Sequence, residues 1–288
     1  MMSDHGEKWY GGTKWLRHRL GDFFSQMSFN APCRLLKDEV KTGVNYVWIN
    51  KEPFEGGKGY LCGVPLKYID KALDNARKYP QARVNIWIDK NLLDSRSLFF
   101  LDSHIYLNAL ENVEIRDLHD IPAYHDLNLF DPDSDDFASL WARVDLARLL
   151  ALDYCLSQGE VSDAFYADFD VEDVKITSRK VKDSLDKYGL VFGRVRSGAI
   201  ENGYMAFRIN EKQEFLKGLI KTTVMDLSPG HCNNGFFSYH NAVNSWIGES
   251  YRKEKKVSVS VLNEINYTIP DNPYYFEIGV NAPANFRG

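Results

Sequence analysis

The sequence has few cysteines, no long basic run and no internal repeat. Its 4 cysteines lie far apart, with neither a C-x-x-C zinc pair nor the density of a disulfide scaffold. Lys and Arg number 35 against 40 Asp and Glu, which gives a net charge of -5. Because no basic stripe is present to neutralise a phosphate backbone, we do not expect nucleic acid as a partner.

Long apolar runs are absent as well. Residues 1–20 are studded with His, Lys, Arg and Gly and lack the apolar core of a signal peptide. No later segment approaches the roughly 20 uninterrupted apolar residues of a transmembrane helix. A soluble protein made in the cytoplasm is therefore expected. An effector exported by a dedicated secretion machine would look the same, because it too lacks a cleaved signal.

The chain does have enough apolar residues for a full core, with 44% hydrophobic and 14% aromatic residues in 288. We expect one main domain over residues 41–288. Residues 1–40 mix aromatic and basic residues without a clear period, and we interpret them as an N-terminal helical appendage.

Strand and helix patterns alternate along the chain. Residues 44–50 form a β-branched and aromatic run, residues 65–78 have helical apolar spacing, and residues 82–89 form a second strand-like run. Such a β-α-β unit predicts an α/β fold with a largely parallel sheet. Ligands of these sheets bind at the carboxyl ends of the strands, where Trp48, Ile49, Asp89 and Asn91 would meet.

The later part of the chain continues this alternation and ends in a polar segment. The expected elements are a helix over 139–156, strands over 164–168, 188–195 and 203–209, a helix over 211–220, and two short strands within 251–288. Residues 226–250 are rich in Gly, Asn, Ser and His, which is typical of a long functional loop.

Two carboxylates, Asp168 and Asp170, follow the predicted strand 164–168 directly. Side chains that only accept hydrogen bonds, spaced two apart, can bind one hard cation such as Mg²⁺ or Mn²⁺ together with phosphate. The alternative is a solvated acidic turn, which the neighbouring Glu172 and Asp173 permit. We expect both aspartates to lie in a solvent-reached cleft.

Asp145 and Arg148 are three apart on the predicted helix and share one of its faces. They form either a helix ion pair of little energetic weight or a donor and acceptor set for a sugar and its phosphates. Trp48 is open to two interpretations in the same way, as a core residue or as a ring that stacks on a nucleobase.

A second polar cluster lies in the late loop. His240, Asn241, Asn244 and Trp246 offer several oxygen or nitrogen ligands and one ring within a single segment. A loop histidine is more often structural than a ligand, but the grouping favours a functional interpretation.

Four blocks of the sequence resemble the bacterial glycosyltransferases with a DXD-containing sugar-binding region, a family that includes the large clostridial glucosylating toxins. The resemblance implies a GT-A type fold, with a mostly parallel central sheet flanked by helices and a mobile C-terminal loop, and retention at the anomeric carbon. The blocks are VWIN (47–50), IWIDKN (86–91), VDLARLLALDYCLSQGEVSDAFYADFD (144–170) and HNAVNSW (240–246).

The resemblance also implies roles for individual residues. It places the nucleotide-sugar donor against Val47, Trp48, Ile49, Asn91, Asp145, Arg148, Tyr166, Asp168, Asn202 and Trp246, with Glu201 as an alternative to Asn202. It places Mn²⁺ or Mg²⁺ at Asp168, Asp170, Asn241, Asn244 and His240. The catalytic set is then Asp168, Asp170, Asp145, Arg148 and Trp246.

The predicted function is metal-dependent transfer of a hexose or N-acetylhexosamine from a UDP-sugar to an acceptor hydroxyl. Two acceptors stay open: a host protein side chain, as for a bacterial effector or toxin, and a bacterial surface polysaccharide. Two other classes are less well supported. One is a phosphatase that uses Asp168 as its nucleophile, and the other is a module that binds sugar nucleotides without turnover.

Overall fold

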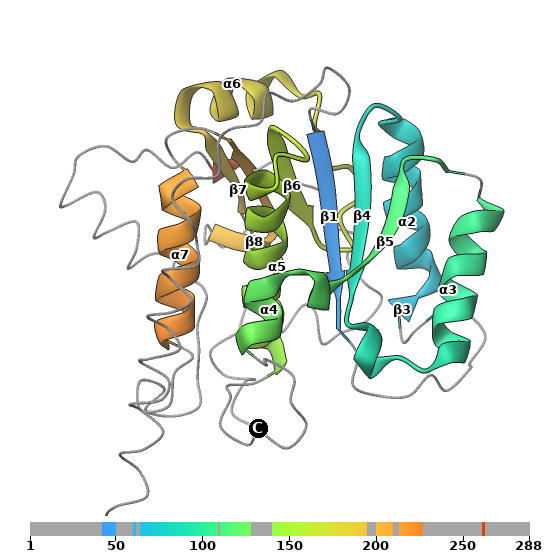
Figure 1. Ribbon diagram of the computed structural model, residues 1–288. Helices are drawn as coiled ribbons and strands as arrows, with labels where there is room; N and C mark the ends of the chain where they lie inside the picture. The colour runs from blue at the N-terminus through green and yellow to red at the C-terminus, as the bar shows by residue number, and fades with distance from the viewer. Residues whose placement is uncertain are drawn as a thin grey trace, which may run out of the picture.

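The computed structural model describes residues 42–49, 60–61, 64–108, 110–127, 140–194, 200–209, 213–226 and 261–262. A seven-stranded sheet lies at its centre, with the spatial order β5-β4-β1-β6-β8-β7-β9 (Figure 1). Its strands are β1 (Thr42–Trp48), β4 (Arg83–Ile88), β5 (Val113–Asp117), β6 (Asp163–Ala167), β7 (Leu190–Arg194), β8 (Ile200–Arg208) and β9 (Val261–Leu262). A separate antiparallel pair is formed by β2 (Tyr60–Leu61) and β3 (Val64–Pro65).

Most of the strand pairs are parallel. Strands β5, β4, β1 and β6 run in one direction, β8 is antiparallel to both β6 and β7, and β9 is parallel to β7. The helices are α2 (Leu66–Lys78), α3 (Ser95–Leu107), α4 (Pro122–Leu127), α5 (Leu140–Ser157), α6 (Arg179–Tyr188) and α7 (Gln213–Asp226), with short 3₁₀ turns η1 (Lys90–Leu92) and η2 (Leu118–Asp120). The predicted α/β fold with a mostly parallel sheet flanked by helices is confirmed.

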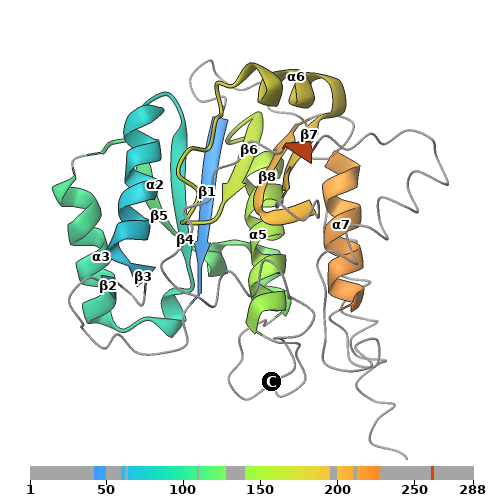
Figure 2. The ribbon, with the colours of Figure 1, turned by 180° about the vertical axis from the view of Figure 1, so that it is seen from behind.

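Helices cover both faces of the sheet. Helices α4, α5 and α7 lie on the face seen in Figure 1, whereas α2 and α3 lie on the face seen in Figure 2. Alternate residues of each strand therefore enter different cores. On β1, Val44 and Tyr46 pack on the α2 side, while Val47 packs on the α5 side.

The strands and helices that alternate clearly in the sequence are found within a few residues of their predicted bounds. Helix α7 extends to Asp226, beyond the predicted end at 220, and α3, β5, α4 and α6 were not predicted. The predicted appendage 1–40 and nearly all of the late loop lie outside the described residues. Among the helices described, none is both long and apolar enough to cross a membrane.

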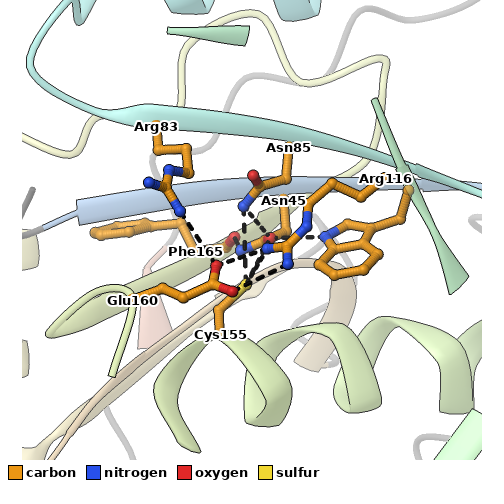
Figure 3. A network of polar contacts seen from close by, with 8 residues as sticks. Asn45, Arg83, Asn85, Arg116, Cys155, Glu160 and Phe165 are labelled. Atoms are coloured by element: carbon orange, nitrogen blue, oxygen red, sulfur yellow. Dashed lines mark hydrogen bonds and ion pairs between the residues drawn. The ribbon is translucent and has the colours of Figure 1, made fainter. Parts of the chain in front are cut away.

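A buried polar network ties α5 to the middle of the sheet (Figure 3). The Asn45 side chain is its hub. Its Oδ1 accepts hydrogen bonds from Asn85 Nδ2 at 2.9 Å, Trp87 Nε1 at 2.9 Å and Cys155 Sγ at 3.4 Å. Its Nδ2 donates to the Phe165 carbonyl at 3.0 Å. One side chain of β1 thus joins β4, β6 and α5.

An ion pair lies beside this hub. Arg116 donates to both carboxylate oxygens of Glu160, at 2.6 and 2.9 Å, and its guanidinium stacks 4.3 Å from the Trp87 ring centroid. Arg83 reaches the same carboxylate at 3.3 Å. Because Glu160 connects α5 to β6, the pair fixes the end of the helix relative to the edge of the sheet.

Candidate functional site

The parallel strands β1, β4 and β6 have their carboxyl ends on one side of the sheet, and predicted site residues lie at or just after these ends. Trp48 closes β1 and pairs in register with Ile88, the last residue of β4. Asp168 follows β6, and its backbone N–H donates to the Gly203 carbonyl of β8 at 2.8 Å. The ends of β1 and β4 therefore lie side by side, as the β-α-β pattern predicts.

The turn that carries the two aspartates is anchored by the residue between them. The Phe169 ring is buried, with its centroid 5.0 Å from that of Tyr46 and 6.2 Å from that of Trp48. The Asp168 side chain is 18% exposed, whereas Asp170 is only 5% exposed. The expected solvent-reached position fits Asp168 but not Asp170, because the chain around Asp170 turns into the core.

Asp145, Arg148 and Asp168 form one charged cluster between α5 and the end of β6. The Arg148 guanidinium lies 3.3 Å from Asp145 Oδ1 and 3.0 Å from Asp168 Oδ1. The pair on α5 is therefore more than a local helix contact, since it includes a carboxylate twenty residues further along the chain. Three of the predicted site residues are brought together by the fold.

Two further predicted residues support this cluster. Tyr166 donates from its hydroxyl to Asp168 Oδ1 at 2.5 Å, and the Arg148 Cζ atom lies 5.0 Å from the Tyr166 ring centroid. Burial raises the pKa of Tyr166 well above its usual value, so the hydroxyl keeps the proton that it donates. Asn202 of β8 donates to Asp145 Oδ1. Five predicted residues thus converge on one point.

The residues predicted on the nucleobase side are distributed differently. Val47 and Ile49 are buried in the core beneath α5, whereas Trp48 is partly buried on the opposite face. Asn91 is exposed in η1, and its backbone N–H donates to Asp89 Oδ1 at 3.0 Å. Of these four residues, Trp48 and Asn91 are therefore the ones whose side chains are exposed enough to contact a ligand.

A cluster that was not predicted closes the ends of β4 and β5. Asp89, Asp117 and His119 bring possible ligand atoms within 4.8 Å of one another, close enough for one metal ion. Both oxygens of Asp89 already accept hydrogen bonds, Oδ1 from His119 at 3.0 Å and Oδ2 from the Tyr124 hydroxyl at 2.6 Å. These bonds give the cluster a capping role at the strand ends. The signal in the sequence is only the short motif Asp117-Leu118-His119, because β5 itself has no clear strand pattern.

Asp168 and Asp170 have the donor chemistry of a divalent-cation site. Carboxylate oxygens suit Mg²⁺ and Mn²⁺. The cluster around Arg148 holds one guanidinium against two carboxylates, and Asp170 adds a third carboxylate two residues from Asp168. Among the described residues of this cluster, carboxylates therefore outnumber the guanidinium, which fits a bound cation. The other predicted ligands, His240, Asn241 and Asn244, lie outside the described residues, as does Trp246.

Searches against known proteins gave similarity only at the level of structure. No protein-family model matches the chain. No curated protein matches it either.

Three solved structures illustrate the range of similarity. Mouse xyloside xylosyltransferase 1, apo form, is 10% identical with a TM-score of 0.44, over 77% of this chain and 85% of that one. PaToxG glycosyltransferase is 13% identical with a TM-score of 0.40, over 83% and 80%. The 4-diphosphocytidyl-2C-methyl-D-erythritol synthase of Anaerococcus prevotii is 10% identical with a TM-score of 0.41, over 80% and 88%. Similarity of this degree does not distinguish sugar transfer from nucleotide transfer.

Proposed function

We propose that this protein is a metal-dependent glycosyltransferase that moves a hexose or N-acetylhexosamine from a UDP-sugar to an acceptor hydroxyl. The observation that carries the proposal is the cluster of Asp145, Arg148, Tyr166, Asp168 and Asn202 at the carboxyl edge of the sheet, two residues from Asp170. A ligand that carries both hydroxyls and phosphates matches this mixture of acceptors and fixed donors.

In this proposal Arg148 binds the donor through its planar guanidinium. Its ion pairs with Asp145 and Asp168 orient the group, while the Tyr166 ring supports one face of it. A guanidinium held in this way can donate to a sugar hydroxyl or to a phosphate oxygen without further ordering of its side chain. Additional positive charge near the diphosphate stabilises the leaving group as the glycosidic bond breaks.

Asp168 and Asp170 would hold the cation, and Asp145 would accept from hydroxyls of the transferred sugar. A bound Mg²⁺ or Mn²⁺ supplies Lewis-acid stabilisation of the departing nucleoside diphosphate. Asn202 holds the Asp145 carboxylate in place. Trp48 and Asn91 would contact the base and ribose, and Trp246, Asn241, Asn244 and His240 would complete the site from the late loop.

The finer assignments follow from the sequence resemblance. It favours retention at the anomeric carbon and UDP as the nucleotide. It also favours a host protein side chain over a bacterial surface glycan as the acceptor, which would make the protein a bacterial effector that acts after export.

The phosphatase alternative is disfavoured by the contacts of Asp168. Its Oδ1 accepts from the Tyr166 hydroxyl and pairs with Arg148. Both contacts draw electron density from the carboxylate and lower its nucleophilicity. An aspartyl-phosphate mechanism would need this carboxylate to attack.

The test is release of UDP from a panel of UDP-sugars by the full chain, with Mn²⁺ and with a chelator, beside Asp170→Asn. We expect metal-dependent release from one sugar and loss of that release in the variant. Release of a sugar 1-phosphate instead of UDP would indicate nucleotide transfer, because UMP then passes to the acceptor. Full activity in the folded Asp170→Asn variant would contradict the metal assignment, and metal-dependent binding without release would indicate a binding module.

A further inference from the structure

The segment that follows the two aspartates has no regular secondary structure and is held from helix α2. Helix α2 lies on the face of the sheet shown in Figure 2, and its Asn75 is only 1% exposed. Its Nδ2 donates to the Val171 carbonyl at 3.3 Å, and its Oδ1 accepts from the Val174 backbone N–H at 3.1 Å. One side chain therefore closes both ends of a four-residue stretch that begins next to Asp170.

Such a clamp is needed because two residues of the segment are buried and, beyond a single β-bridge at Val171, no strand or helix pairs its backbone. Val171 and Val174 are fully buried, and buried peptide groups must find partners. The Asn75 amide serves as that partner, and it is itself oriented by a bond from Nδ2 to the Tyr46 hydroxyl at 3.1 Å. The Tyr204 hydroxyl donates to the Val174 carbonyl at 2.8 Å, which fixes the same residue from β8.

The last residue of α2 and the residue after it hold the partly exposed Asp173 of the segment. Asp173 accepts from the Tyr79 hydroxyl at 2.5 Å and pairs with Lys78 at 2.6 Å. Lys175, which follows, has a left-handed backbone with φ 48 and donates its N–H to Asp173 Oδ1 at 3.0 Å. The chain between Asp170 and Lys175 is thus shaped by α2 at several points.

We infer that Asn75 is a positioning residue for the cation site, an inference that rests on the proposed function. The carbonyl bound by Asn75 belongs to Val171, the residue after Asp170. Without the amide, the Val171 carbonyl and the Val174 N–H each lose a hydrogen bond, and the turn that carries the Asp170 carboxylate can shift. Partners of this outer kind typically change metal affinity by about 10–100-fold when they are removed.

The experiment compares Asn75→Leu with Asn112→Leu in the full chain. Asn112 offers a matched control, because its Nδ2 also donates to backbone carbonyls, those of Ala76, Tyr79 and Ala82, from the end of α2 to the residue before β4. The Ala82 contact lies at the amino end of β4, whereas Asp168 lies at the carboxyl end of β6. Both variants lose hydrogen bonds from a single amide, but only one of them touches the segment after Asp170.

Mn²⁺ affinity is measured by titration in the presence of UDP, and UDP affinity is measured separately without metal. We expect Asn75→Leu to weaken Mn²⁺ binding by about tenfold or more. Asn112→Leu should bind Mn²⁺ as the wild type does, and metal-free UDP affinity should stay unchanged in both. Asn75→Ser, which removes the same contacts with a smaller side chain, replaces Asn75→Leu if that variant does not fold.

The outcomes separate this inference from the function on which it rests. If the wild type binds Mn²⁺ and the folded Asn75 variant binds it within twofold of the wild type, the positioning role is wrong while the proposed function stands. Equal weakening in the Asn112 variant would likewise overturn the role. If the wild type binds no Mn²⁺ with or without UDP, the metal assignment fails and this inference fails with it.

Discussion

Arg148 and Arg116 are two arginines with nearly the same surroundings and different consequences. Their side chains are 11% and 12% exposed, each lies over an aromatic ring, and each pairs with acidic groups. Arg116 binds a single carboxylate through two short bonds, at 2.6 and 2.9 Å. Arg148 instead divides its contacts between Asp145 and Asp168, at 3.3 and 3.0 Å.

The difference indicates how one helix can serve two purposes. Near its end, α5 is fixed by Cys155 and by the pair of Arg116 with Glu160, a bidentate contact that satisfies both charges inside the core. Nearer its start, the helix presents Arg148 at the edge of the sheet with longer, shared contacts. Contacts of this kind leave the guanidinium able to exchange one partner for a ligand.

The largest effect on activity is expected when the planar guanidinium of Arg148 is replaced by a group of the same charge. Arg148→Lys should lower UDP release on the order of 10³-fold, because an ammonium group cannot reproduce the guanidinium geometry. Stability should change little, since the charge near the two aspartates remains. Single-turnover rates and urea unfolding of the same preparation check both parts. Activity within a few-fold of the wild type would place Arg148 outside the reaction.

Breaking the ion pair of Arg116 with Glu160 should lower stability and leave activity unchanged. Arg116→Met leaves the partly buried Glu160 with the more distant Arg83, at 3.3 Å, and we expect a loss of about 2 kcal/mol in the free energy of unfolding. The folded fraction should release UDP at close to the wild-type rate. Urea denaturation measures the loss, and adding Glu160→Leu should recover part of it. A variant that stays stable but loses activity would contradict the division between the two arginines.

The smallest effect is expected at Cys155 and appears only at alkaline pH. Burial raises the pKa of this thiol from 9.0 to about 12, so the folded protein keeps it protonated. A raised folded pKa contributes stability that is complete below pH 9 and is lost as the pH rises towards 12. The wild type should therefore lose on the order of 1 kcal/mol more than Cys155→Ala by pH 10. Parallel pH dependences of the two unfolding free energies would contradict this.

The predictions that the structure confirms depend on residues close together in the sequence. Asp145 and Arg148 are three apart on α5, a long and mostly apolar segment without Gly or Pro, and Asp168 follows a short apolar strand. Apolar spacing does not predict α3. Its Phe99, Tyr106 and Leu107 are exposed, so apolar residues are not confined to the buried face of the helix. Strand β5 is not predicted either, because it is a short edge strand without a continuous apolar run.

The sequence by itself determined the α/β class, the alternation of strands and helices, and the residues that carry the candidate chemistry. Only the tertiary structure decided which distant residues support them. Asn75 reaches Val171 across 96 positions, and Asn45 reaches Cys155 across 110. Helical and strand periodicities extend over a few residues only, because they arise from local backbone geometry. Contacts between side chains from different elements depend on how the sheet and helices pack, and local periodicity does not encode that packing.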